Sequence, residues 1–199
     1  MMTTASTPKG ERRRHALTEA AAALLVEGGF DAVRHRAVAE RAGLPLASTT
    51  YYFGSLDELI VAAVEHHGRQ ELTRGGELLD RLPKRSLGTE AVIDLVLDQL
   101  LGPPAGELDA ERVLLRYERL VATFRRPYLR PIMHALGAEL RGLLLEVFAR
   151  CGADFDAQRI EQLIALVDGT VVNALIEIDP DPRAAARRML REFLPPESH

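Results

Sequence analysis

Short segments with helical spacing of apolar residues, separated by glycine and proline, make up most of this sequence. In the first of them, about Arg12 to Gly28, the stripe consists of Ala16, Leu17, Ala20, Ala23 and Leu24. Residues at this spacing lie on one face of an α-helix. We find no alternating stretch typical of a strand, no internal repeat and no low-complexity tract. The sequence therefore predicts an all-α fold.

Capping residues and helix breakers indicate the boundaries of about nine helices. Ser55 followed by Glu58 fits a capping box. Asp156 fits an N-cap, and Asp181 followed by Pro182 is the clearest helix start in the chain. The predicted helices span about residues 12–28, 35–42, 45–53, 55–79, 89–101, 108–125, 128–150, 157–178 and 182–194.

Composition is that of an ordinary globular protein and limits the classes to consider. With 199 residues, 47% hydrophobic and 27% charged, the chain can form one large domain or two small ones. Its longest apolar run, Ala20–Val26, is too short to cross a bilayer, and no leader segment opens the chain. We therefore expect a cytoplasmic protein with no membrane partner. The single cysteine, Cys151, excludes an internal disulfide framework and fits a buried structural thiol.

Charge is distributed unevenly along the chain. The net charge of −4 argues against a protein that coats nucleic acid with its whole surface. Residues 1–54 hold seven lysines and arginines against five acids, a net charge of +2, whereas the remaining residues carry −6. This asymmetry predicts that only the N-terminal part meets a polyanion.

Residues 34–53 fit a helix-turn-helix, a unit whose second helix enters the major groove of DNA. Ala39 is small where the two helices approach, and Gly43 suits the left-handed backbone of the turn. Pro45 disfavours helical geometry at the preceding residue and so separates the helices. Such a pattern also arises by chance where two short helices meet at a glycine. The TYYF run, the capped helix after it and the basic arm before it favour the DNA-binding interpretation.

The second helix of this motif has a short, uncharged outer face. Thr49 and Phe53 lie four residues apart and are expected to face inward. Small and hydroxyl side chains on the opposite face suit thymine methyl groups and base edges, while tyrosine hydroxyls suit phosphates. Positive charge must then come from arginines outside this helix. The predicted DNA-contacting residues are Arg12, Arg34, Arg36, Pro45, Leu46, Ala47, Ser48, Thr50, Tyr51 and Tyr52.

The segment GGFDAVRHRAVAERAGLPLASTTYYFGSLDELI resembles the DNA-binding region of the TetR family of bacterial transcriptional repressors. The shared features are a G-[YF]-x-A segment, an A-x-x-A-G segment and T-x-Y-x-[YF] before a capped helix. The resemblance implies a helix-turn-helix domain over residues 9–54 and a helical effector-binding and dimerisation domain over residues 55–199. It also implies a homodimer that leaves a near-palindromic double-stranded DNA operator when a small-molecule effector binds.

Four positions depart from the family's pattern, among them Thr50, where a first tyrosine is usual, and Thr49, where a core leucine is usual. Arg34 stands where a capping serine or threonine is usual, so the second helix should lack one capping bond. Leu56 stands where a phosphate-binding lysine is common. These departures leave the fold expectation intact and the operator sequence open.

The helix expected over residues 157–178 carries apolar side chains around most of its circumference. A helix of this kind must be covered on both sides. We predict that residues 157–178 and 182–194 form an isologous homodimer interface, as the family's usual arrangement implies. The alternative is a central core helix within a monomer.

Polar residues that interrupt the apolar stripes of the second domain are candidate effector contacts. They are His66, Arg116, Tyr117, His134, Asp168 and Asn173. Each can also be interpreted as a satisfied buried group or a solvated surface residue. The apolar helix around Asp168 and Asn173 favours these two, and the low aromatic content argues against a flat, stacked multidrug site.

The sequence predicts no cofactor, no metal site and no enzyme activity. His66 and His67 are adjacent and point about 100° apart on a helix, so they do not share one ion easily. The nucleophile-elbow, zinc-protease, phosphate-loop and dinucleotide motifs do not occur. The alternatives that remain are a helical small-molecule-binding protein without operator activity, an all-α enzyme, and a transcriptional activator with the same fold.

Overall fold

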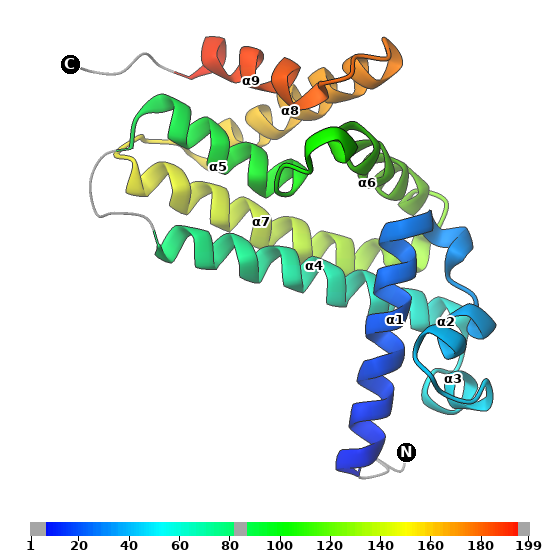
Figure 1. The fold of residues 1–199 in the computed structure, drawn as a ribbon. Helices are drawn as coiled ribbons and strands as arrows, with labels where there is room; N and C mark the ends of the chain where they lie inside the picture. The colour runs from blue at the N-terminus through cyan, green and yellow to red at the C-terminus, as the bar shows by residue number, and fades with distance from the viewer. Residues whose placement is uncertain (1–6, 82–86, 195–199) are drawn as a thin grey trace. The chain divides into compact units, whose positions relative to one another are not determined.

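The computed structural model describes residues 7–81 and 87–194, which form nine α-helices, two short 3-10 turns and no strand (Figure 1). The helices are α1 (Pro8–Ala32), α2 (His35–Arg41), α3 (Ala47–Tyr52), α4 (Leu56–Asp80), α5 (Thr89–Leu101), α6 (Asp109–Thr123), α7 (Arg130–Arg150), α8 (Ala157–Ile176) and α9 (Pro182–Phe193), and the turns are η1 (Gly106–Leu108) and η2 (Pro127–Leu129). The all-α prediction with about nine helices is confirmed.

The described residues pack as two compact units. The first unit holds residues 7–69 and 118–132, and the second holds residues 70–81, 87–117 and 133–194. The helices α4, α6 and α7 therefore each contribute residues to both units. The predicted domain boundary after residue 54 was placed at the end of the helix-turn-helix motif and not by packing, and it stays a prediction. Residues 82–86 and 195–199 of the predicted second domain lie outside the described residues.

The first helix, α1, begins before its predicted start and resumes after its predicted end. The hydroxyl of Thr7 caps it by accepting a hydrogen bond from the Gly10 amide at 3.2 Å, and Pro8 follows at the first helical position. The Gly28–Gly29 pair interrupts the helical geometry, with Gly29 at φ 69°. The chain then makes another turn because Phe30 is buried in the core of the first unit. The glycine pair is therefore a bend, not the expected end.

The core of the first unit forms where α1, α2 and α3 pack on one another (Figure 1). Its almost fully buried side chains include Leu17, Ala21, Val38, Thr49, Phe53, Leu59 and Ala63. Residues 118–132, which also belong to this unit, contact its core through Arg126, whose guanidinium lies 4.1 Å from the centre of the Phe30 ring.

The start of α4 carries the predicted capping box in a shifted form. The Ser55 hydroxyl accepts a hydrogen bond from the Glu58 amide at 3.1 Å, as expected. The Glu58 carboxylate accepts one from the Gly54 amide at 2.8 Å, one residue before the expected donor. Because α4 follows α3 after a very short link, this double cap fixes where α3 ends.

In the second unit α9 packs on both α5 and α8 (Figure 1). The predicted caps are confirmed: the Asp156 carboxylate accepts from the Arg159 amide and the Asp181 carboxylate from the Ala184 amide, both at 2.8 Å. The eighth helix ends at Ile176, two residues before its predicted end, and Ile178 has a left-handed φ of 58°.

A buried arginine of α9 ties together three parts of the second unit. Arg183 is 7% exposed, and its Nε donates to the Asp109 carboxylate at 3.0 Å. Its guanidinium also reaches the Asp98 carboxylate at 3.3 Å and the carbonyl oxygen of Gly102 at 2.6 Å. The burial of Arg183 is compensated by these acceptors, and α9 is thereby fixed to the end of α5 and the start of α6.

Two further features concern the length and hydropathy of the helices and the single cysteine. No helix in the described part of the chain is long and apolar enough to span a membrane. Cys151 is half-buried, less than predicted, and burial raises the pKa of its thiol. A thiol with a raised pKa is a poor nucleophile, which fits the structural role expected for this residue.

Candidate DNA-contacting face and ligand site

A tight corner between α2 and α3 places α3 at the surface of the first unit. Gly43 adopts φ 63°, the left-handed conformation predicted for the turn. The corner is closed by a hydrogen bond from the Leu44 amide to the Ala39 carbonyl at 3.0 Å. Ala39 is 3% exposed, so its small side chain lies where the helices meet. The helix-turn-helix geometry expected from residues 34–53 is present.

The two faces of α3 differ as the spacing predicts. Thr49 and Phe53 are 0% and 1% exposed, and the Thr49 hydroxyl donates to the Leu46 carbonyl at 2.8 Å. On the opposite side Leu46 is 52% and Tyr51 is 80% exposed. The remaining predicted contact residues of this segment are exposed (Pro45, Ala47, Thr50) or half-buried (Ser48, Tyr52). The helix itself begins at Ala47, so Pro45 and Leu46 precede it.

Hydrogen bonds and ring contacts orient the polar groups of this outer face. The Thr50 hydroxyl donates to the Ala47 carbonyl at 3.2 Å, so its lone pairs remain as acceptors. An acceptor at this point suits the amino groups of adenine or cytosine in the major groove. The rings of Tyr51 and Tyr52 meet edge to face with centres 4.9 Å apart, a contact that restricts the exposed Tyr51 ring.

The arginines around this face differ in whether they pair with an acid. Arg12 and Arg36 are exposed. Arg34 is also exposed; its Nε donates to the Asp31 carbonyl at 3.0 Å, and it provides no side-chain cap for α2, as predicted. Arg41 binds both carboxylate oxygens of Glu27, at 2.7 Å for the longer bond, and so joins α2 to α1. The charge available for a polyanion therefore comes from the exposed arginines.

In the second unit two of the predicted effector residues form a hydrogen-bonded pair. The hydroxyl of Tyr117 on α6 donates to the Asp168 carboxylate on α8 at 2.7 Å. Burial raises the pKa of Asp168, and the bond from Tyr117 and the charge of Arg116 offset only part of this rise. Burial likewise raises the pKa of the Tyr117 phenol, and its carboxylate neighbour raises it further. The pair is thus a partly desolvated acidic site.

A third predicted residue, Arg116, lies beside this pair in sequence and binds an acid that the sequence analysis missed. Its guanidinium donates to the Glu71 carboxylate of α4 at 2.8 Å, and both side chains are largely buried. Nothing in the sequence around Glu71 distinguishes it from a surface acid of α4, since the partner lies 45 positions away.

The other three predicted effector residues lie elsewhere. The ring of His66 packs edge to face on the ring of His15 in the first unit, with centres 5.5 Å apart. His134 on α7 and Asn173 on α8 are exposed. The structure therefore brings Arg116, Tyr117 and Asp168 together and leaves the other three outside this cluster. No group of acidic, histidine or cysteine side chains suited to a metal ion occurs among the described residues.

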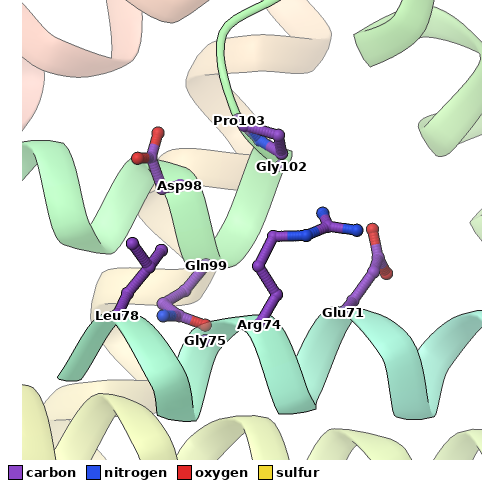
Figure 2. A pocket seen from close by; sticks show the side chains of 8 residues that line it. All are labelled: Glu71, Arg74, Gly75, Leu78, Asp98, Gln99, Gly102 and Pro103. Carbon is purple, nitrogen blue, oxygen red and sulfur yellow. The ribbon is translucent and has the colours of Figure 1, made fainter. Parts of the chain in front are cut away.

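A hollow between α4 and α5 lies next to this cluster and was not predicted (Figure 2). It is small and opens to solvent, and Glu71 is among its lining residues. Gln99 of α5 extends onto α4 beside Gly75 and is 8% exposed. A Cβ atom at Gly75 would lie 2.1 Å from Gln99 Oε1, so any other residue there would displace the end of the Gln99 side chain. One sequence signal could have found it: Gln99 interrupts the apolar run at the end of α5.

Two family models match the chain. The description "Bacterial regulatory proteins, tetR family" covers residues 17–63, which include α2 and α3. The description "Tetracyclin repressor-like, C-terminal domain" covers residues 87–196, more than half of the chain.

Individual relatives match nearly the full length. The HTH-type transcriptional regulator PksA of Bacillus subtilis is 25% identical over 173 residues, which are 84% of this chain and 80% of that protein. The multidrug binding protein EbrR complexed with imidazole is 28% identical with a TM-score of 0.66, over 94% of this chain and 97% of that one. The transcriptional regulator SCO7518 of Streptomyces coelicolor A3(2) is 27% identical with a TM-score of 0.66, over 92% and 98%.

Proposed function

The chain belongs to the TetR family of transcriptional regulators, and from this premise we propose that it is a homodimeric repressor released from its operator by a small organic effector. A regulator of this kind would act on chromosomal DNA in the cytoplasm. The single observation that carries the proposal is the neutral, exposed outer face of α3 standing on a fully buried inner face.

The proposed reading role of α3 rests on its shape and lack of charge. With no arginine or lysine on the helix, short side chains such as Ala47 and Thr50 allow close approach to the bases. The exposed hydroxyl of Tyr51 would bind a phosphate and position the unit. Arg12, Arg34 and Arg36, which are all exposed, would supply the charge that attracts the backbone.

The proposed homodimer rests on the outer face of α8. Its inner face is buried through Ile160, Leu163, Val167, Val171 and Ala174. Large apolar side chains on the other side remain exposed in the single chain: Leu166, Val172 and Ile176, with Ile178 just beyond the helix end. Such a stripe needs a cover, and an isologous contact between two copies of α8 would provide it. In this proposal residues 182–194 flank the contact.

The proposed effector site is the cluster formed by Arg116, Tyr117 and Asp168 with Glu71. It is polar, partly desolvated and joins α4, α6 and α8 within the second unit. A relative 28% identical to this chain, EbrR, has been crystallised with imidazole and with ethidium. These complexes support an effector of small organic size.

The proposed mechanism is a population shift. An effector that binds better when the two DNA-contacting units are spread apart would lower the fraction of dimers whose spacing fits the operator. Both half-sites must be engaged together, so a modest change in spacing would release the DNA. An effector that bound tightly without altering operator affinity would contradict this mechanism, since coupling between two sites is reciprocal.

To test the proposal, the purified protein is mixed with DNA fragments of the genome that encodes it, and the fragments that it retains are sequenced. The affinity of the protein for one retained fragment is then measured at a series of salt concentrations. For a working repressor the logarithm of the affinity falls linearly with the logarithm of salt concentration, by about 0.9 for each phosphate contact. Retention of no fragment, together with binding of small molecules, would favour the alternative of a helical ligand-binding protein without operator activity.

A further inference from the structure

Three consecutive arginines occupy the second turn of α1, and only one of them is centred on the face that packs against α2 and α3 (Figure 1). That face includes Leu17, Ala21 and Leu25, which are at most 2% exposed. Successive residues of an α-helix are about 100° apart, so Arg14 lies within about 20° of Ala21, whereas Arg12 lies about 180° from it. Arg14 therefore extends from the buried face of α1, although its own side chain is exposed.

The side chain of Arg14 is held at the end of α3. Its guanidinium carbon lies 5.0 Å from the centre of the Phe53 ring, and Phe53 directly follows the last residue of α3. This ring is 1% exposed, so packing fixes it and it offers a stationary face to the cation. A guanidinium held in this way loses less conformational freedom on binding an anion than a free surface arginine does.

The charge of Arg14 is not neutralised by the described residues. None of their acids forms an ion pair with it, and its guanidinium donates no hydrogen bond to them. Glu58, an acid in the first turn of α4, is bound to the Gly54 amide at 2.8 Å. Arg41, in contrast, is paired with Glu27. The donors of Arg14 are thus available beside a helix that carries no positive charge of its own.

We propose that Arg14 binds a backbone phosphate of the operator next to the end of α3, and that Phe53 positions it there. The inference rests on the proposed function and adds a contact to the same DNA-binding face. The forked donors of a guanidinium match two oxygens of one phosphate. A phosphate contact carries no sequence information, so Arg14 fixes the register of α3 in the groove while the side chains of α3 select the bases.

The test measures how the affinity for duplex DNA depends on salt in the full-length wild type and in Arg14→Met. Methionine keeps an unbranched apolar side chain over Phe53 but removes the charge and the donors. The probes are a retained genomic fragment and a random-sequence duplex of the same length. We expect the slope of log affinity against log salt concentration to become shallower by about 0.9 for each subunit, or about 1.8 for a dimer, with both duplexes. An unchanged slope, or a change confined to the genomic fragment, would overturn the proposal.

Two further variants distinguish a phosphate contact from a general effect of charge. Arg14→Lys keeps the charge but not the fork, and should keep most of the salt dependence while binding DNA more weakly. Arg125→Met removes the same charge from another exposed arginine of the first unit. Arg125 precedes Arg126, whose partner Phe30 lies roughly 24 Å along α1 from Arg14, so this control should leave the slope nearly unchanged. Equal changes of slope in Arg125→Met and Arg14→Met would overturn the proposal.

A double-mutant cycle tests the positioning by Phe53. Phe53→Leu keeps the core apolar but removes the ring, and circular dichroism checks that the variant folds. Arg14→Met should weaken DNA binding less in this background than in the wild type, and an equal loss would overturn the positioning role. If the wild type retains genomic fragments but Arg14→Met binds them with the wild-type slope, the Arg14 contact is wrong and the repressor stands. If the wild type binds no duplex, the repressor and this contact are both wrong.

Discussion

The hydroxyl of Tyr117 and the carboxylate of Asp168 lie 2.7 Å apart although 51 positions separate them in sequence. This bond joins α6 to α8 within the second unit. It also holds a partly buried carboxylate within the proposed effector site, where protonation of that carboxylate affects the stability of the fold.

We expect Asp168→Asn to stabilise the protein at neutral pH but not at acidic pH. Burial raises the pKa of Asp168 in the folded state above its ordinary value of 3.8, so the folded protein binds a proton more tightly than the unfolded chain. Wild-type stability then falls as the pH rises from about that value through the folded pKa. Urea unfolding at a series of pH values should show the variant gaining on the wild type across this window. Tyr117→Phe removes a hydrogen bond that lowers the pKa of Asp168, so the stability of this variant should fall over a wider pH range than that of the wild type. A stability difference between Asp168→Asn and the wild type that is the same at every pH would contradict this account.

Arg183→Ala should destabilise the second unit by about 3–5 kcal/mol, because it leaves partly buried carboxylates without a counter-charge. Asp109 is the stronger partner: burial raises the pKa of Asp98 even though Arg183 lowers it, which marks the Asp98 contact as incomplete. Denaturant unfolding measures the loss. Arg188→Ala is the control, since this arginine is 64% exposed and lies 4.0 Å from Asp179, and should change stability by no more than about 0.5 kcal/mol.

Gly43→Ala should destabilise the first unit by about 1–2 kcal/mol, the cost of a left-handed backbone at a residue with a Cβ atom. A Cβ at this position would meet no atom within 4 Å, so the whole cost is conformational. Thermal unfolding of Gly43→Asn should show a smaller loss, because asparagine tolerates this conformation. Equal losses of stability for both variants would contradict a conformational cause and would indicate a steric clash at residue 43.

Ile176→Glu should convert the proposed dimer to a monomer with an intact fold. Ile176 is 73% exposed on the outer face of α8, so a charge there is harmless unless a second copy covers it. Sedimentation velocity at micromolar concentration gives the oligomeric state. Val121→Glu is a matched control at a side chain that is 71% exposed in the first unit. Dissociation by the control and not by Ile176→Glu would place the interface elsewhere.

Tyr51→Phe should weaken binding to every DNA sequence alike, because its hydroxyl is proposed to meet a phosphate. Thr50→Ala should instead change the preference among sequences, with the largest loss where adenine or cytosine faces the position. Selection from a randomised duplex pool, followed by sequencing of the bound fraction, measures both. A uniform effect of Thr50→Ala on all sequences would show that its hydroxyl does not read bases.

Local features of this protein were predictable from sequence, and pairings between distant segments were not. The caps at Asp156 and Asp181 and the corner at Gly43 follow from residues a few positions apart, and the structure confirms all three. The bend at Gly28–Gly29 could not be distinguished from a helix end, because the burial of the following residue depends on tertiary packing.

At the proposed ligand site, the contacts between distant segments were even harder to predict from sequence. Arg116 and Asp168 were named as single polar residues within apolar stripes, but their partners come from other helices. Gln99 was passed over because its role depends on Gly75, which lies 24 positions earlier on another helix and leaves space for its side chain. The break that Gln99 makes in the apolar run of α5 marks it as unusual, but neither helix alone shows that Gly75 is the residue that leaves space for it.

The bidentate ion pair of Arg41 with Glu27 has a further consequence for how an effector could act on the first unit. It joins α2 to α1 independently of the corner at Gly43. Under the proposed mechanism these two helices would move together, so an effector would change the fraction of operator that is bound and leave the base preference of α3 unchanged.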